Sequence, residues 1–202
     1  MKVAVLLFEE FETLDVFGPV EIFGRLNEFY QISFYSLSGG LVRNSHGVSV
    51  MSGKLTELSS ETDIFLIPGG YGTRVEVNNA VLIDKIKEIS TLSKFVLTIC
   101  TGSSLLAKTG LLNNRKATSN KIAFDWVTTQ GKNVNWIRKS RWIADGKYYT
   151  SSGVSAGMDM TLGFLQDLHG IDFARKVAFE IEYNWQEDSQ EDNFYKLPVV
   201  NN

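Results

Sequence analysis

Cys100 is the only cysteine in the chain, and it directly follows an apolar run at residues 95–99. The residues after it, TGSSLLA, begin small and become helix-forming, so the segment predicts a buried strand, a sharp turn and a helix. A thiol at such a turn lies beside the free N–H groups at the start of the helix, which stabilise a thiolate. Cys100 is therefore a candidate nucleophile. The alternative is a small buried hydrophobic side chain, the commoner fate of free cysteines.

A second candidate group lies in the loop after the first apolar run. Residues 9–15 carry four carboxyl groups, those of Glu9, Glu10, Glu12 and Asp15. Asp15 has apolar neighbours on both sides, so we expect surroundings that raise its pKa and keep it protonated. A protonated carboxyl group can donate to a thiolate, whereas an ionised one repels it. A helix cap is the open alternative for Asp15, and the three glutamates are predicted to be solvated or to cap the next helix.

The third candidate segment is PGGYG at residues 68–72, which follows the apolar run 64–67. Its glycines let the backbone approach a ligand closely and adopt positive φ. The N–H groups of Gly70 and Thr101 could then surround a developing negative charge as an oxyanion site. A tight turn without a ligand remains the alternative for this segment.

The sequence provides few residues for other catalytic chemistries. His46 lies in a Gly/Asn/Ser loop and His169 precedes Gly170 at a predicted helix end, so neither is an obvious base for Cys100. One cysteine and two scattered histidines lack the close spacing of zinc ligands. The glycine-rich loop has neither the Lys-Ser/Thr of a P-loop nor the three-glycine dinucleotide pattern. We therefore expect no metal and no cofactor.

The elements that must position these groups alternate along the chain. Strands are predicted at 3–8, 32–37, 64–67 and 95–99, and helices at 14–26, 81–92, 103–108, 122–130, 155–169 and 173–182. Turn-like residues interrupt the alternation at 38–40 with 44–47, and at 145–147, where a hairpin is predicted. This pattern predicts an α/β sandwich with a mainly parallel sheet, whose ligands bind at the carboxyl ends of the strands.

Length and composition set broader limits. At 202 residues we expect a single domain over 1–186, with a tail over 187–202 that packs on the surface or on a second subunit. A formal net charge of −3 gives no basis for holding a nucleic acid, and no apolar run reaches the roughly 18 to 20 residues that span a bilayer. Without a signal peptide or a possible internal disulfide, we expect a cytoplasmic protein acting on a small molecule.

Several motifs, taken together and in order, resemble the ThiJ/PfpI superfamily, and within it the isocyanide (isonitrile) hydratase branch and the matching domains of some transcription regulators. They are LDVFGP from Leu14, IPGG from Ile67, ICTGS from Ile99, RKAT from Arg115 and GVSAGMD from Gly153. The resemblance implies a flavodoxin-like, class I glutamine amidotransferase-like three-layer sandwich and a homodimer.

By position, the resemblance also implies roles for individual residues. Cys100 would be the nucleophile on a strained elbow, Asp15 its acidic partner, and the N–H groups of Gly70 and Thr101 the lining of an anion pocket. One departure concerns the substrate, since the hydratase-like members often carry a histidine near the position of Asn120.

Three functions are consistent with the sequence. The first is an isocyanide hydratase-like lyase that uses Cys100 and Asp15 to form an N-substituted formamide. The second is a glyoxalase or deglycase acting on reactive dicarbonyls, although that branch usually pairs its cysteine with a glutamate and a histidine. The third is a redox sensor without catalysis, in which Cys100 is oxidised to a sulfinic acid beside a protonated Asp15.

Overall fold

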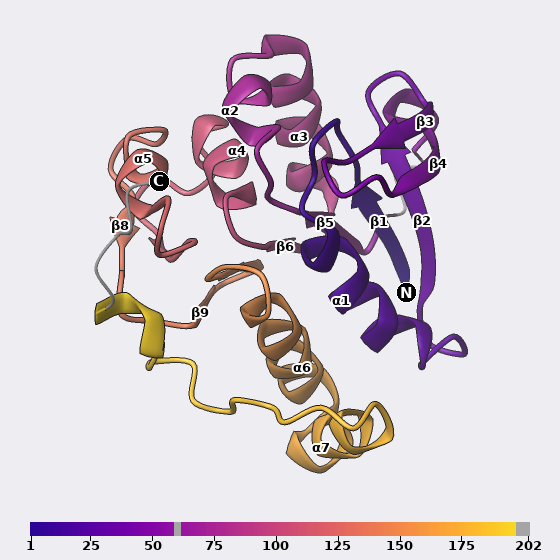
Figure 1. Ribbon diagram of the computed structural model, residues 1–202, viewed down its shortest axis with the longest axis vertical. Coiled ribbons are helices and arrows are strands. Elements are labelled where there is room, and N and C mark those ends of the chain that lie inside the picture. The colour runs from indigo at the N-terminus through magenta and orange to yellow at the C-terminus, as the bar shows by residue number, and fades with distance from the viewer. Residues whose placement is uncertain (59–61, 197–202) are drawn as a thin grey trace.

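The short apolar runs of the sequence form the centre of an eight-stranded sheet, with strand order β3-β4-β2-β1-β5-β6-β10-β9. The computed structural model describes residues 1–58 and 62–196 (Figure 1). The strands of this sheet are β1 Lys2–Leu6, β2 Gln31–Ser36, β3 Gly40–Arg43, β4 Ser49–Lys54, β5 Ile64–Ile67, β6 Phe95–Thr98, β9 Trp142–Asp145 and β10 Tyr148–Ser151. The four predicted strands are confirmed as β1, β2, β5 and β6, each within two residues of its predicted ends.

The core of the sheet is parallel. Strand β1 pairs with β2 and β5, β5 pairs with β6, and β6 pairs with β10, all in parallel. Every residue of β5 is buried, as expected of a strand covered by helices on both faces. The antiparallel pairs lie at the two edges, β3 with β4 and β9 with β10. The predicted mainly parallel α/β architecture is therefore confirmed.

Helices cover both faces of the sheet. Figure 1 shows α2, α3 and α4 on one side and α1, α6 and α7 on the other. Their bounds are α1 Thr13–Gly24, α2 Thr73–Glu76, α3 Ala80–Leu92, α4 Gly102–Lys108, α5 Phe124–Thr128, α6 Ala156–His169 and α7 Ile171–Glu180. The six predicted helices correspond to all of these except α2, whose four residues are too few to show a helical period. No helix among residues 1–58 and 62–196 has the length and apolar character that a bilayer span requires.

The turn-like residues of the sequence lie next to the two antiparallel strand pairs, of which the sequence predicted one. The hairpin predicted around residues 145–147 is confirmed as β9 and β10. The turn-like residues at 38–40 and 44–47 instead flank a strand, β3, because glycine and asparagine turns here delimit a short edge pair with β4. A further small parallel pair, β7 Lys116–Ala117 with β8 Asn135–Trp136, is also absent from the sequence prediction, since two-residue strands carry no detectable alternation.

The segment after α7 packs back onto the rest of the chain. The backbone oxygen of Ser189 accepts from the N–H of Arg141 at 2.8 Å, and the N–H of Asp192 donates to the oxygen of Lys139 at 2.9 Å. Asp192 is fully buried. The part of the predicted tail up to residue 196 thus lies on its own subunit, and residues 197–202 lie outside the described part of the chain.

Candidate functional site

Three loops meet at the carboxyl ends of the neighbouring strands β1, β5 and β6. The loops after β1 and β5 are joined by backbone hydrogen bonds, from Glu12 N to Gly69 O at 2.9 Å and from Gly72 N to Glu10 O at 3.3 Å. The loop after β6 contains Cys100. Because the strands are parallel neighbours, segments far apart in the sequence are brought to one edge of the sheet, as the sequence predicts.

Cys100 adopts a left-handed backbone conformation, with φ of 55°. This conformation costs a non-glycine residue roughly 1–2 kcal/mol, so the surrounding structure must hold it. The Cys100 N–H donates to Ser152 O at 3.1 Å, and the Cys100 carbonyl accepts from the hydroxyl groups of Ser103 at 3.1 Å and Ser119 at 2.8 Å. The sharp turn predicted at this position is present, and both sides of the strained peptide are fixed.

Asp15 lies in the first turn of α1 and is fully buried. Its Oδ2 accepts from the Gly69 N–H at 2.9 Å, across to the next loop, so its carboxyl group does not cap its own helix. The helix-cap alternative for this residue is therefore wrong, and the N-cap of α1, Glu12, makes no side-chain capping bond either. Burial raises the pKa of Asp15 well above its usual value, with a smaller contribution from the Glu12 charge, which is the direction that the sequence predicts.

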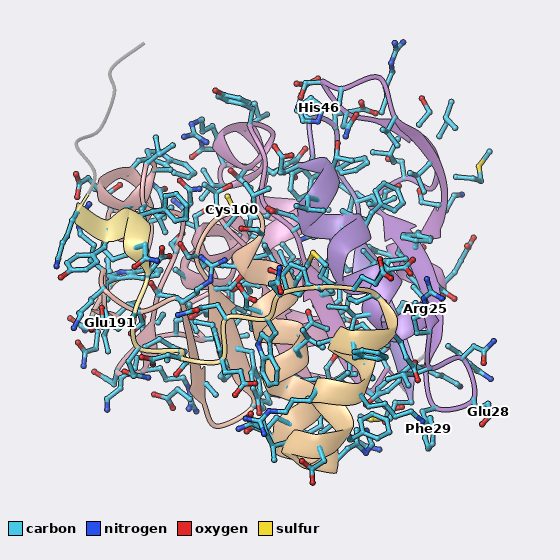
Figure 2. All side chains as sticks on the ribbon, turned by 60° about the horizontal axis from the view of Figure 1, so that its bottom comes forward. Arg25, Glu28, Phe29, His46, Cys100 and Glu191 are labelled. Carbon is cyan, nitrogen blue, oxygen red and sulfur yellow. The ribbon has the colours of Figure 1, made fainter. Side chains whose placement is uncertain are left out.

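The sulfur of Cys100 is less accessible than the sequence suggests. Only 7% of the residue is exposed, and Figure 2 shows it within the outline of the molecule. Burial, and then the charge of Asp15, raise the pKa of the Cys100 thiol well above its usual value. The N–H of Thr101 at the start of α4 lowers the pKa of the thiol, in the direction expected from the sequence, but desolvation outweighs this effect.

Three donors oppose this rise in the pKa of Cys100. They are the N–H of Thr101, the N–H of Val154 and the hydroxyl of Thr101. Each stabilises negative charge on the sulfur. When Asp15 is protonated its charge no longer opposes the thiolate, so one negative charge shared by Asp15 and Cys100 can reside on the sulfur.

Gly70 has a different role from the one predicted. Its N–H donates to Thr101 Oγ1 at 3.1 Å, and Thr73 Oγ1 lies 3.0 Å from the same oxygen. Gly70 has φ of 130°, a conformation that few other residues adopt. In this structure Gly70 therefore holds the Thr101 side chain in place, and its N–H is already occupied.

Gly69 allows the close approach of the loops. A Cβ atom at this position would lie 2.6 Å from Thr101 N, 2.7 Å from Thr101 Oγ1 and 2.9 Å from Asp15 Oδ2. A methyl group would therefore occupy the space between the carboxyl group and the helix start. The glycine at position 69 is a requirement of the site rather than of a turn alone.

Val154 is the site residue that the sequence analysis missed. It lies in the loop after β10, and its N–H faces Cys100 where the N–H of Gly70 was expected. Its φ of 51° is a strained conformation for a β-branched residue. The surrounding residues belong to one of the motifs that resemble the superfamily, which is the available signal, but a valine gives no indication of positive φ.

Both histidines are engaged elsewhere. His46 Nδ1 lies 2.7 Å from Thr13 Oγ1 at the start of α1, and His46 is at the periphery in Figure 2. His169 is the last residue of α6, and its Nε2 lies 2.8 Å from the Tyr30 hydroxyl. Asn120, at the position where the resemblance leads one to expect a histidine, accepts from the N–H of Ala123 at 2.9 Å.

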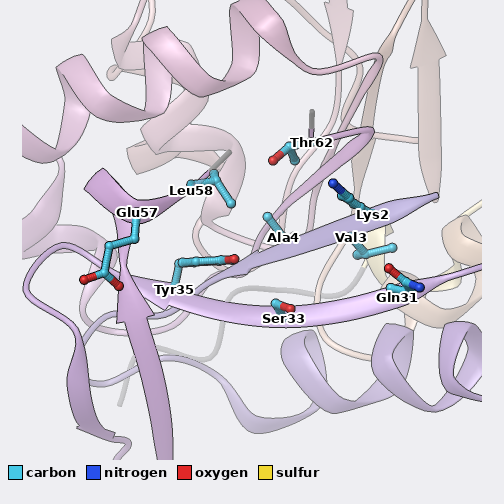
Figure 3. Close-up of a pocket in the computed structure, with 9 residues that line it drawn as sticks. All are labelled: Lys2, Val3, Ala4, Gln31, Ser33, Tyr35, Glu57, Leu58 and Thr62. Atoms are coloured by element: carbon cyan, nitrogen blue, oxygen red, sulfur yellow. The ribbon is translucent and has the colours of Figure 1, made fainter. Parts of the chain in front are cut away.

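One cavity of the structure is lined by residues other than the cysteine and its neighbours. This cavity, of about 250 Å³, lies against β1 and β2 and is lined in part by Lys2, Gln31, Ser33, Tyr35 and Glu57 (Figure 3). Alternate residues of β2 share this surface, which places the cavity on a face of the sheet. It contains none of the candidate site residues.

Among the described residues no three His, Cys, Asp or Glu side chains are arranged to hold a metal ion. The groups that the structure gathers are instead a thiol, a carboxyl group, two backbone N–H groups and a hydroxyl. This set can perform nucleophilic addition with proton transfer, because it contains a nucleophile, an acid and donors for developing charge.

Known structures share this architecture. A ThiJ/PfpI family protein from Pseudomonas syringae superposes with a TM-score of 0.83 and 24% identity, covering 91% of this chain and 75% of that one. Oxidised DJ-1 from Toxoplasma gondii gives a TM-score of 0.75 and 24% identity over 91% of this chain and 99% of that one. At these identities the likeness concerns the fold.

Sequence comparison reaches the same group of proteins. An isonitrile hydratase from Pseudomonas putida is 28% identical over 183 residues, which are 91% of this chain and 78% of that protein. The HTH-type transcriptional regulator CdhR from Pseudomonas aeruginosa is 28% identical over 86% of this chain, which spans about half of that protein (52%). The family model of the DJ-1/PfpI family matches residues 1–167, and the chain therefore belongs to the DJ-1/PfpI family.

Proposed function

We propose that this protein is a cysteine-dependent hydratase that adds water to a small isocyanide and releases an N-substituted formamide. The observation that carries the proposal is the buried pair of Asp15 and Cys100. Oδ2 of Asp15 accepts from the Gly69 N–H, while Oδ1 is buried without a hydrogen-bond partner among the described residues. Asp15 and Cys100 act on each other electrostatically: the Cys100 side chain lowers the pKa of the carboxyl group, and the charge of Asp15 raises the pKa of the thiol.

This pairing suits a substrate whose carbon accepts a nucleophile and then a proton. The thiolate of Cys100 attacks the terminal carbon of R–N≡C and forms the carbon–sulfur bond. Asp15 gives its proton to that carbon, which yields a thioimidate, Cys–S–CH=N–R. No leaving group departs in this step, so the site needs one acid and no second base.

Water then resolves the thioimidate. The Asp15 carboxylate takes one proton from water as the water oxygen adds to the carbon, and it passes that proton to the nitrogen, which becomes N–H. The carbon–sulfur bond of the tetrahedral intermediate then breaks and releases the Cys100 thiolate. The remaining hydroxyl proton passes to Asp15, which returns to its acid form as the formamide carbonyl forms. The N–H groups of Thr101 and Val154 stabilise the sulfur each time it carries charge.

Similarity to the Pseudomonas putida isonitrile hydratase over most of the chain supports this reaction. The acidic partner here is an aspartate, and both histidines have partners away from Cys100. A glyoxalase or deglycase that needs a histidine beside its cysteine is therefore less well supported.

The test is incubation of the pure protein with cyclohexyl isocyanide and quantification of N-cyclohexylformamide. We expect turnover by the wild type and none by Cys100→Ala. Asp15→Asn is expected to lose about 100-fold or more in kcat, since general acid catalysis contributes 10²–10⁴-fold. Glu9→Gln, in the same loop but hydrogen bonded to the N–H of Arg43 at 3.3 Å, is the matched control and should retain activity.

An inactive wild type, or equal turnover by Cys100→Ala, removes the proposal. Lactate formation from methylglyoxal by the same samples would favour the dicarbonyl enzyme. Conversion of Cys100 to its sulfinic acid by mild peroxide, with no turnover of either substrate, would favour a sensor.

A further inference from the structure

Arg141 is a buried charged residue, 8% exposed, that contacts both sides of the loop carrying Val154. We propose that Arg141 is a positioning residue that holds the Val154 N–H against the Cys100 sulfur. The expected effect of Arg141 on turnover rests on the proposed function, whereas its expected effect on the Cys100 thiol does not.

The backbone of Arg141 fixes one end of this loop. Its carbonyl accepts from the N–H of Ser152 at 2.8 Å, and the Ser152 carbonyl in turn accepts from the N–H of Cys100 at 3.1 Å. Ser152 therefore links the backbone of Arg141 to the backbone of Cys100. These two hydrogen bonds fix the position of Ser152 relative to Cys100.

The side chain of Arg141 fixes the other end. One guanidinium nitrogen, Nη2, donates to Ser155 Oγ at 3.2 Å. Val154 lies between Ser152 and Ser155, so the two contacts of Arg141 bracket it. A residue in a left-handed conformation persists only where its surroundings determine it, and these contacts provide that constraint.

Arg141 is itself held rigidly. Its Nε and Nη2 both lie 2.6 Å from Asp159 Oδ2, and its Nη1 lies 3.7 Å from Asp192 Oδ1. Oδ1 of Asp159 accepts from the N–H of Gln186 at 3.0 Å. The planar guanidinium can reach a carboxylate and Ser155 together, which a lysine ammonium cannot do with the same geometry.

Two substitutions test the proposal. Arg141→Lys keeps the charge beside Asp159 but loses the forked contact, and Ser155→Ala removes the loop contact while leaving the ion pair intact. Ser155→Ala carries the test if Arg141→Lys does not fold. Arg115→Lys is the matched control, because Arg115 pairs with Asp145 at 3.1 Å at the far end of the same hairpin.

The readout is the pH dependence of Cys100 alkylation by iodoacetamide, followed by mass spectrometry. Cys100 is the only cysteine, so one modified site is measured. Each variant is also measured in an Asp15→Asn background, which removes the titratable group facing the sulfur. The titratable and charged groups that interact with Arg141 are Asp159, Asp192, Lys121 and Tyr183. The Arg115→Lys control is measured over the same pH range.

We expect the alkylation midpoint of Arg141→Lys and of Ser155→Ala to rise by about half a pH unit or more, the partial loss of one donor to a charged group. The variant that combines Arg141→Lys with Ser155→Ala should have the same alkylation midpoint as Arg141→Lys alone, since both changes remove the contact between Arg141 and Ser155. On cyclohexyl isocyanide, kcat should fall about threefold or more with KM unchanged.

An unchanged midpoint in Ser155→Ala overturns the proposal, whatever happens to the melting temperature. A midpoint that also rises in Arg115→Lys overturns it too, because the effect would then belong to the hairpin in general. Raised midpoints in a protein whose wild type does not hydrate isocyanides would leave Arg141 as a positioning residue and remove the proposed function alone.

Discussion

Asp15, in the first turn of α1, and Cys100, in the turn after β6, are a buried carboxyl group and a buried thiol that interact electrostatically. Burial raises the pKa of both groups, so the site resists carrying two negative charges. Most of the chemical behaviour expected of this protein follows from that pair.

Replacing Asp15 by asparagine should separate the reactivity of the thiol from turnover. The carboxylate raises the pKa of Cys100, so Asp15→Asn should lower the pH at which iodoacetamide modifies the sulfur. Turnover of the isocyanide should nevertheless fall, because the proton donor is lost. A midpoint that rises in Asp15→Asn would contradict this account of the pair.

The same variant should change the pH dependence of stability. The pKa of Asp15 is raised in the folded protein, so its stabilising contribution is complete below the unfolded value near 3.9 and is lost as pH rises through the folded value. Asp15→Asn has no such loss. Its melting temperature relative to wild type should therefore increase between pH 4 and pH 7, and thermal melts across that range would show it.

Gly69→Ala should damage the site, whereas Gly24→Ala should be harmless. The new methyl group at position 69 would meet Thr101 and Asp15 at under 3.0 Å, so we expect lower stability and loss of alkylation at Cys100. At position 24, in α1, nothing lies within 4 Å. There alanine should stabilise the helix by about 0.5–1 kcal/mol. Denaturant unfolding of both variants checks the contrast, and equal behaviour would argue against a crowded Gly69.

Thr101→Val removes the hydroxyl while keeping the shape of the side chain. It takes a donor from the Cys100 sulfur and leaves the N–H of Gly70 without its acceptor. We expect a higher alkylation midpoint and a loss of about 1–3 kcal/mol in unfolding free energy. Thr73→Val is the control, since Thr73 contacts Thr101 and not the sulfur. Similar midpoints in the two variants would show that the Thr101 hydroxyl does not act on the thiol.

Asp192→Asn tests the buried charges beneath the C-terminal segment. Asp192 Oδ2 lies 3.8 Å from Lys121 Nζ, and burial lowers the pKa of Lys121 to about 8. Removing the carboxylate leaves a buried cation with less compensation, so the variant should be less stable at pH 7 by about 3–5 kcal/mol. Glu191→Gln, which breaks an exposed pair with Lys139, should leave the melting temperature unchanged.

The pH dependence of this effect has a definite sign. Below a pKa of about 8, Lys121 is charged and needs Asp192. Above it the folded protein binds fewer protons at Lys121 than the unfolded chain, so this contribution to stability increases with pH. The difference between Asp192→Asn and wild type should shrink from pH 7 to pH 9.5. A difference that grows would show that Arg141, and not Lys121, is the cation that depends on Asp192.

Local patterns in the sequence were enough to predict the strands β1, β2, β5 and β6, the longer helices, and the place of Cys100 after β6. Apolar runs bounded by turn residues are local signals. They predict strands well because a strand buried on both faces of a sheet accommodates few polar side chains. The raised pKa of Asp15 was also predictable, since its neighbours in sequence are apolar. The edge strand β3 and the short α2 were not, because four residues carry too little periodicity.

Which groups act on the Cys100 sulfur depends instead on contacts between segments that are far apart in the sequence. The N–H of Val154 acts on the Cys100 thiol because β10 pairs with β6 and Val154, in the next loop, has a left-handed conformation. Neither fact can be predicted from the residues around position 154. The N–H of Gly70 was excluded because Thr101 already accepts it. The upward shift of the Cys100 pKa is likewise due to burial, which depends on how many distant segments cover an atom and is not a property of its own stretch of sequence.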